Sequence, residues 1–375
     1  MGSLKNKNSK GLLICLAAML LGIFFFGLRP KDFYLFNNVT WISHQNGIHF
    51  GKYGIAYTDS CFSSDRDGSR LPDSGLSVEI ALKSGAVKDE RFKFLLVLHN
   101  GDDSKQFLIG QWRSSIILMN GDDYDGKQGI KKIAVRGALL PHKTRFVTIT
   151  SAEEEGTKVY IDGQLAAKKR DLFLKIPDGR EETRLVVGNS IYGRHSWEGN
   201  IYGLAIYQYT ITAKDAAFHF MRWSKERNFL FAKEDEPELL YIFDEKTGET
   251  AFDQAGGNHH IRMPSIMKML KRQMLVLPWH KIEFNRSLIQ DIIINILGFI
   301  PLGFLLNILF INMGGFIKEH AFLITVSHCF LISLIIEIAQ SWMPSRSSSM
   351  LDLILNTLGA LLGTMCYRFY LRIRK

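Results

Sequence analysis

The stretch of sequence that decides the fold is residues 288–311, LIQDIIINILGFIPLGFLLNILFI. It carries a single charge, an aspartate, and as a helix it is long enough to cross the roughly 30 Å hydrocarbon core of a bilayer. Two more apolar segments follow at 320–342 and 350–370, and an uncharged run lies at 11–28. Together these segments predict a multi-pass membrane protein with four transmembrane helices.

The uncharged run at 11–28 follows three lysines, at positions 5, 7 and 10. A cleaved signal peptide is the alternative, but the sequence FFFGLRP at 24–30 lacks the small-x-small pattern of a cleavage site. We therefore expect an uncleaved anchor, with residues 1–29 as N-terminal tail and transmembrane helix. Because cytoplasmic segments carry the excess of lysine and arginine, the N-terminus is expected inside.

Residues 30–265 are polar and rich in turn residues. Residues 76–83 (LSVEIALK) alternate between apolar and polar, and Asn-Gly or Asp-Gly pairs follow apolar runs at 100–101, 120–121 and 162–163. Such pairs between alternating runs are the strongest short-range signal for β-hairpins. The region therefore predicts an all-β sandwich or barrel, closed by a helix over 213–223.

Three pieces of this region appear in a fixed order: KVYIDG at 158–163, VGN at 187–189 and WEGNIYGLAIY at 197–207. Their succession resembles the later strands of laminin-G-like domains, over about residues 35–230. The resemblance implies a concanavalin A-like sandwich, as in lectins and glucanases, with a glycan or a protein as its ligand. No strand carries paired carboxylates in a Glu-x-Asp-x-Glu pattern, so glucanase chemistry is not expected.

Residues 239–263, LLYIFDEKTGETAFDQAGGNHHIRM, look like the opening strand pair of such a domain, although they follow its closing strand. They either complete the sandwich from its C-terminal side or form a tether with hairpin character. For the domain boundaries we take the second alternative, and we expect a sandwich at 30–232 and a hairpin-like linker at 233–265.

The next residues alternate between apolar and basic side chains at helical spacing. Apolar side chains recur at 266, 269, 270, 274 and 277, opposite Lys268, Lys271 and Arg272. This pattern predicts a cationic amphipathic helix lying in the membrane interface, within an interfacial segment at 266–286. Contact with anionic lipids would account for these basic residues on the outer side.

The apolar C-terminal region contains NILGFIPLGF at 295–304, EIAQ at 337–340 and DLILNTLGALLG at 352–363. This succession closely resembles the VanZ-like family, over about residues 275–370, and residues 287–375 are assigned to a VanZ-like transmembrane domain. The resemblance implies a bacterial cell-envelope protein of the cytoplasmic (inner) membrane. The family is named after a member linked to low-level resistance to the glycopeptide teicoplanin, so a role in that resistance or in envelope polysaccharide is implied.

With the N-terminus inside, four helices place the sandwich outside and both termini in the cytoplasm. Lys318 and the basic C-terminal end then lie inside, as the positive-inside rule expects. The net charge of +9 is spread out, and no basic stretch is interleaved with aromatic residues. Membrane lipids are therefore expected partners and nucleic acid is not.

The membrane segments repeat one polar pattern, Asp-x3-Asn-x2-Gly, at 291–298 and again at 352–359. Spacings of three and four residues put each trio on one helix face. These two helices run in the same direction, and Glu337 and Gln340 lie near the outer end of the helix between them. We therefore expect a cluster at one depth, made of Asp291, Asn295, Glu337, Gln340, Arg346, Asp352 and Asn356.

Two interpretations of this cluster stay open. Amides can hydrogen-bond across helices as polar glue while glycines permit close approach, with Asp352 and Arg346 as a local ion pair. Ionisable groups within a membrane are costly and normally face the bundle interior or a water-filled cavity. Three carboxylates with one arginine therefore also predict a site for a polar or cationic headgroup, a proton or an ion.

Two Asn-Gly-Asp-Asp turns, at 100–103 and 120–123, are candidates for calcium, which prefers oxygen ligands. The candidate ligands are Asp102, Asp103, Asp122, Asp123 and Asp125. Plain hairpin turns are the alternative, and no other cofactor is expected. His259-His260 is expected to be a surface pair, and Cys61 a buried free thiol.

These observations favour a non-catalytic envelope protein. Its sandwich would bind a glycan or a protein outside the cell, and its membrane domain would recognise a lipid-linked or lipid ligand. The alternative is a membrane enzyme that acts on an envelope glycan or lipid at the carboxylate cluster. A purely structural anchor is the third hypothesis.

Overall fold

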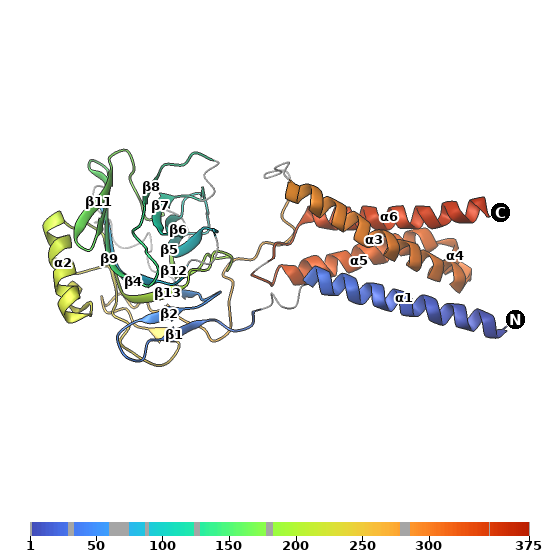
Figure 1. Ribbon diagram of the computed structural model, residues 1–375, viewed down its shortest axis with the longest axis horizontal. Helices are drawn as coiled ribbons and strands as arrows, with labels where there is room; N and C mark the ends of the chain where they lie inside the picture. Colours follow the sequence, from blue (N-terminus) through green and yellow to red (C-terminus); the bar gives the residue numbers. More distant parts are fainter. Residues whose placement is uncertain are drawn as a thin grey trace. The chain divides into compact units, whose positions relative to one another are not determined.

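The computed structural model describes residues 2–28, 34–59, 75–86, 90–123, 128–177, 183–277, 286–344 and 346–374. The chain divides into two compact units. One unit is helical and is built from Met1–Phe33 and Lys271–Lys375, and the other is a β-sandwich built from Tyr34–Leu270 (Figure 1).

Two antiparallel sheets of eight strands each form the sandwich in the described part of the chain. The first sheet has the order β1-β2-β13-β4-β9-β10-β11, with β14 paired to β13. Its strands are β1 (Val39–Trp41), β2 (Ile48–Phe50), β4 (Leu76–Ser84), β9 (Thr144–Ala152), β10 (Gly156–Ile161), β11 (Gln164–Lys169), β13 (Gly199–Tyr207) and β14 (Leu239–Tyr241).

The second sheet has the order β15-β16-β3-β12-β5-β6-β7-β8. Its strands are β3 (Ala56–Thr58), β5 (Lys93–His99), β6 (Phe107–Trp112), β7 (Ser115–Asn120), β8 (Lys132–Val135), β12 (Arg184–Val187), β15 (Thr250–Ala251) and β16 (Ile261–Arg262). The predicted combination of an all-β sandwich with a helical membrane domain is confirmed.

The predicted turn at 162–163 shows how the sequence sets the strands. Ile161 pairs with Gln164, so Asp162 and Gly163 form a two-residue hairpin turn. Both have positive φ, 52° and 74°, as a type I′ turn requires and as Asp-Gly readily adopts. The inner faces of both sheets then bury one apolar core that includes Phe50, Leu96 and Trp197.

Helix α2 (Ala213–Glu226) and the 3-10 helix η2 (Leu230–Asp235) pack against the outer face of the first sheet. The hydroxyl of Thr212 caps α2 by accepting from the Asp215 N–H. Trp223 of α2 packs with Phe146 of β9 and Phe229. The helix predicted over 213–223 is confirmed, and it continues for three residues.

The linker assigned to 233–265 is wrong, because residues 239–263 complete the sandwich. Strand β14 pairs with β13, and the β15–β16 hairpin pairs with β3 at the edge of the second sheet. Tyr241, Phe243 and Ile261 are fully buried in the common core. The sandwich would lose this part of its core if it ended at residue 232.

The amphipathic helix predicted over 266–277 is also wrong. These residues form no helix, because their backbone N–H groups bond to other segments rather than to carbonyls four residues earlier. Met267 N–H donates to the Leu35 carbonyl and Leu270 N–H to the Ile191 carbonyl. Residues 278–285 of the predicted interfacial segment lie outside the described residues.

The helical unit contains α1 (Gly2–Leu28), α3 (Arg286–Met313), the short α4 (Gly315–Glu319), α5 (Ala321–Gln340) and α6 (Met350–Ile373). In the described part of the chain, four helices are long and apolar enough to cross a membrane, namely Lys10–Leu28, Leu288–Met313, Ala321–Gln340 and Met350–Ile373. The protein is therefore a membrane protein, and its predicted spans are confirmed.

Helices α3 and α6 pack with their backbones in contact, because glycines leave room there. A Cβ atom at Gly303 of α3 would lie 2.2 Å from the Ala360 carbonyl oxygen, and one at Gly363 would lie 2.0 Å from that of Ile300. Gly359 and Gly363 are four residues apart on α6 and form the small-xxx-small pattern typical of close helix pairs in membranes. Helix α1 completes the bundle through Leu16, which is buried with Phe299.

Candidate functional site

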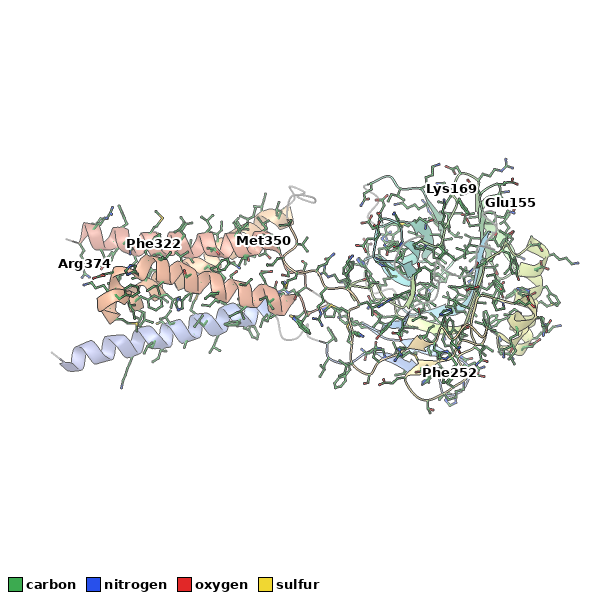
Figure 2. The ribbon with its side chains drawn as sticks, turned by 180° about the vertical axis from the view of Figure 1, so that it is seen from behind. Glu155, Lys169, Phe252, Phe322, Met350 and Arg374 are labelled. Atoms are coloured by element: carbon green, nitrogen blue, oxygen red, sulfur yellow. The ribbon has the colours of Figure 1, made fainter. Side chains whose placement is uncertain are left out.

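A cavity of about 580 Å³ lies among α1, α3, α5 and α6. Its apolar lining comes mainly from α1 and includes Met19, Ile23 and Phe26. Its polar lining contains every residue of the predicted membrane cluster: Asp291, Asn295, Glu337, Gln340, Arg346, Asp352 and Asn356. The structure thus brings all seven to one cavity. Figure 2 labels Met350, the first residue of α6, and Arg374, which follows the last residue of α6.

The two copies of the Asp-x3-Asn-x2-Gly pattern meet at the cavity. The Asn295 amide of α3 donates to the Asp352 carboxylate of α6 over 2.8 Å. The two glycines differ in role, because Gly359 packs against the Ile296 carbonyl whereas a Cβ at Gly298 would meet nothing within 4 Å. Gly298 therefore opens the cavity, and Gly359 brings the helices together.

Glu337 is 1% exposed and accepts a 2.7 Å hydrogen bond from the Ser349 N–H. Ser349 is the N-cap of α6, and its hydroxyl accepts from the N–H groups of Leu351 and Asp352. The carboxyl group of Glu337 thus lies at the N-terminus of α6, where backbone N–H groups are available to donate to it. This carboxylate holds α5 and the start of α6 together.

Gln340 and Arg346 hold the C-terminal end of α1. The Gln340 amide donates to the Gly27 carbonyl over 2.9 Å, and an Arg346 guanidinium nitrogen lies 3.4 Å from the Phe26 carbonyl oxygen. The last carbonyls of a helix lack intrahelical partners, so donors at this position are stabilising. Arg346 lines the same cavity as Glu337 and Asp352.

Asn356 lines the cavity and has an unmet hydrogen-bonding requirement. It is 5% exposed, and its amide nitrogen donates to the Ser333 hydroxyl over 2.9 Å. Its Oδ1 is buried and has no partner. Turning the amide by 180° would leave the nitrogen unpartnered instead, so one polar atom stays unsatisfied either way. A buried unsatisfied group costs about 1–3 kcal/mol.

Carboxylates outnumber cations in this cavity. Asp291, Glu337 and Asp352 line it, and Arg346 is the one basic residue among its described lining. The balance favours a ligand that brings hydrogen-bond donors or a positive charge.

The C-terminal region can be compared with known families. Residues 239–371 match the family model VanZ/LLP1. This part of the chain is VanZ-like. The match runs from β14 into α6, so the VanZ-like region includes the three helices that carry the polar cluster. The anchor helix α1, which supplies the apolar wall, lies outside it.

Solved structures that are similar to the sandwich match it at low identity. The sialidase domain CBM40 of Ruminococcus gnavus is 15% identical with a TM-score of 0.34, over 46% of this chain and 95% of that one. A protein of Bacteroides ovatus that is described as carbohydrate-binding is 13% identical with a TM-score of 0.40, over 64% of this chain and 60% of that one. No curated protein matches the chain. The laminin-G part of the sequence resemblance stays a prediction.

Three of the aspartates predicted to bind calcium accept hydrogen bonds from protein donors. Asp102 accepts from the N–H and hydroxyl of Ser104, and Asp103 accepts from the Tyr192 hydroxyl. Asp123 is fully buried and accepts from two backbone N–H groups, those of residues 128 and 130. Within the described ranges, no group of three or more His, Cys, Asp or Glu could hold a metal. Asp125 and Cys61 lie outside these ranges.

The sequence did not identify two parts of the site. The apolar wall from α1 carries no polar signal, and Gly22 and Gly27 look like ordinary residues of a membrane anchor. Ser333 and Ser349 were also missed, because their importance depends on the partners Asn356 and Glu337, which lie on other segments.

Proposed function

We propose that this protein is a non-catalytic binding protein of the bacterial cytoplasmic membrane. In this proposal the cavity of its VanZ-like domain holds the polar headgroup of a lipid or of a lipid-linked molecule. The sandwich lies outside and recognises a glycan or a protein of the envelope. The observation that carries the proposal is the cavity with three carboxylates and the unsatisfied amide of Asn356, set among membrane-spanning helices.

The shape and chemistry of the cavity suit an amphiphile. Its volume of about 580 Å³ falls within the roughly 300–1,000 Å³ of small-molecule sites. Residues of α3, α5 and α6 form most of the polar side of the cavity. The apolar side chains of α1 offer a surface for a hydrocarbon chain. Because ionised groups in a membrane are costly without partners, a headgroup with amine or hydroxyl donors would stabilise this arrangement.

Polar glue explains part of the cluster. Glu337, Gln340 and Arg346 each hold a helix end, so their presence alone does not require a ligand. Interhelical hydrogen bonding does not explain Gly298, which keeps space open beside the carboxylates. It also does not explain the amide oxygen of Asn356, which has no partner. These two features favour a binding site. Enzymatic turnover at the carboxylates and a link to teicoplanin resistance stay predictions.

The test fills the cavity without disturbing the bundle. In Gly298→Leu the new side chain enters space that no protein atom occupies within 4 Å of its Cβ. Native mass spectrometry of the purified protein should show a bound lipid or lipid-linked molecule in wild type and its loss in Gly298→Leu. The matched control is Leu297→Phe, at a neighbouring residue that is 59% exposed and does not line the cavity. A wild-type protein without such a ligand, or equal retention in Gly298→Leu, would contradict the proposal.

A further inference from the structure

A second cavity, of about 340 Å³, lies on the sandwich beside the β15–β16 hairpin. Its lining includes Asp59 after β3, Thr250 and Phe252 from the region of β15, and His260 and Arg262 from the region of β16. Asn258 and His259, in the turn of the hairpin, complete it. All of these residues lie within the sandwich unit. The volume falls in the roughly 300–1,000 Å³ range of small-ligand sites.

The loop that carries this cavity is held rigid by Asp253. This carboxylate is 7% exposed and accepts from the N–H groups of Leu240, Ala255 and His259, at 3.1, 3.0 and 3.3 Å. A loop fixed in this way loses little freedom when a ligand binds, which favours affinity.

Phe252 gives the cavity an exposed aromatic surface. Its side chain is 48% exposed, although the neighbouring residues Ala251 and Asp253 are buried. The ring meets the His260 ring edge-to-face, with centroids 5.0 Å apart. Figure 2 labels Phe252 at the surface of the sandwich. An aromatic ring held in this position offers a flat apolar surface next to polar groups.

The polar groups around Phe252 include both donors and acceptors. The Nδ1 of His260 accepts from the Asp253 N–H, so in the neutral ring the proton is on Nε2, which can donate. Arg262 Nε lies 2.7 Å from the Asp59 carboxylate, and the planar guanidinium has further N–H groups to donate. The charges of Arg262 and Asp59 offset each other, so the cavity carries no strong net charge.

From this geometry we infer that the cavity binds a neutral saccharide. A sugar ring presents C–H groups on one face, which pack on an aromatic ring, and hydroxyls at its edge, which both donate and accept hydrogen bonds. Because Arg262 and Asp59 are paired with each other, neither charge is left to select an acidic sugar or an amino sugar. The inference deepens the proposed function, since it rests on the sandwich having a glycan rather than a protein ligand.

The experiment uses the full chain in lipid nanodiscs and saturation-transfer NMR. The neutral probes are glucose, galactose, N-acetylglucosamine and cellobiose, and glucuronic acid and glucosamine are their charged counterparts. Phe252→Ala should weaken binding of the neutral probes about tenfold, by loss of the aromatic surface. Phe218→Ala is the matched control, because Phe218 has the same exposed fraction of 48% but lies on α2, and it should bind as wild type does.

Arg262→Ala is the second variant. Its ion pair with Asp59 joins two exposed side chains, so its loss should leave folding intact while weakening saccharide binding. If a neutral saccharide binds equally well to wild type and Phe252→Ala, the site is wrong but the glycan role of the sandwich stands. Binding of the charged probes alone would overturn the ligand class. If none of the probes binds, both the site and the glycan role fail.

Discussion

His219 joins α2 to two carboxylates of the sandwich. Its Nδ1 lies 3.0 Å from the Glu79 carboxylate of β4, and its Nε2 lies 3.3 Å from that of Asp235. Burial alone would lower the pKa of His219, but the hydrogen bond and charge of Glu79, together with Asp235, raise it above its ordinary value of 6.5. The protonated ring therefore fastens the helix to the sheet.

This network predicts how stability depends on pH. Because folding raises the pKa of His219, its contribution is complete below about pH 6.5 and is lost as pH rises through the folded-state pKa. The thermal midpoint of the sandwich, followed by tryptophan fluorescence, should therefore fall as pH rises above about 6.5. His219→Gln should flatten this dependence, whereas His44→Gln, at an exposed histidine, should preserve it. An unchanged slope in His219→Gln would exclude this histidine as the cause.

A comparison of two buried asparagines can distinguish a role in ligand binding from a role in helix packing. Asn356 and Asn307 are both buried and both have an unpartnered Oδ1, but Asn356 lines the cavity and Asn307 bonds to α5 away from it. Replacement of either by Ala should cost about 0.6 kcal/mol, the average for interhelical hydrogen bonds in membranes. Native mass spectrometry should show ligand loss for Asn356→Ala alone. Equal retention in both variants would leave only a packing role for Asn356.

At the scale of residues, helical spacing explains why the polar residues of the predicted cluster lie together along one cavity. Residues four and three apart on parallel helices must face the same way at the same depth, so Asp291, Asn295, Asp352 and Asn356 could be grouped without coordinates. The different roles of Gly298 and Gly359 could not be predicted. They depend on where the neighbouring helix lies, and the repeated pattern contains no information on that.

The element on which the bundle depends most is the α3–α6 pair. A Cβ at Gly363 would lie 2.0 Å from the Ile300 carbonyl oxygen, so Gly363→Ala must push the two helices apart. Overpacking of this kind costs about 1–3 kcal/mol. Thermal unfolding in detergent should show the loss for Gly363→Ala and little change for Gly298→Ala, whose Cβ meets open space. Equal midpoints would show that α3 and α6 do not pack as described.

At the scale of elements, sequence patterns predicted structure that depends on neighbouring residues in the chain. They failed where contacts with distant segments determine the structure. The Asp162-Gly163 hairpin and the helix α2 depend on neighbouring residues and were predicted. Strands β14 to β16 were assigned to a linker, because the order of strands in a sheet does not follow the order in the chain. Residues 266–277 have a helical period, yet their N–H groups find partners on other segments.

For the whole molecule, the charge distribution predicts that both termini lie in the cytoplasm. The test is a single cysteine at position 373, introduced as Ile373→Cys in a chain whose native cysteines are replaced by serine or alanine. A membrane-impermeant thiol reagent added to intact cells should leave this cysteine unlabelled and should label it after permeabilisation. Labelling in intact cells would rule out the topology with four spans and a cytoplasmic N-terminus.

The central claim is that the polar cavity of the VanZ-like domain holds a lipid or lipid-linked ligand. The most direct measurement is a cryo-electron microscopy map of the chain purified in nanodiscs from its own membrane. The account predicts non-protein density in the cavity, with a headgroup next to the Asn356 amide and the carboxylates of Glu337 and Asp352. A cavity that contains only water, or a map in which these side chains face the bilayer, would contradict it.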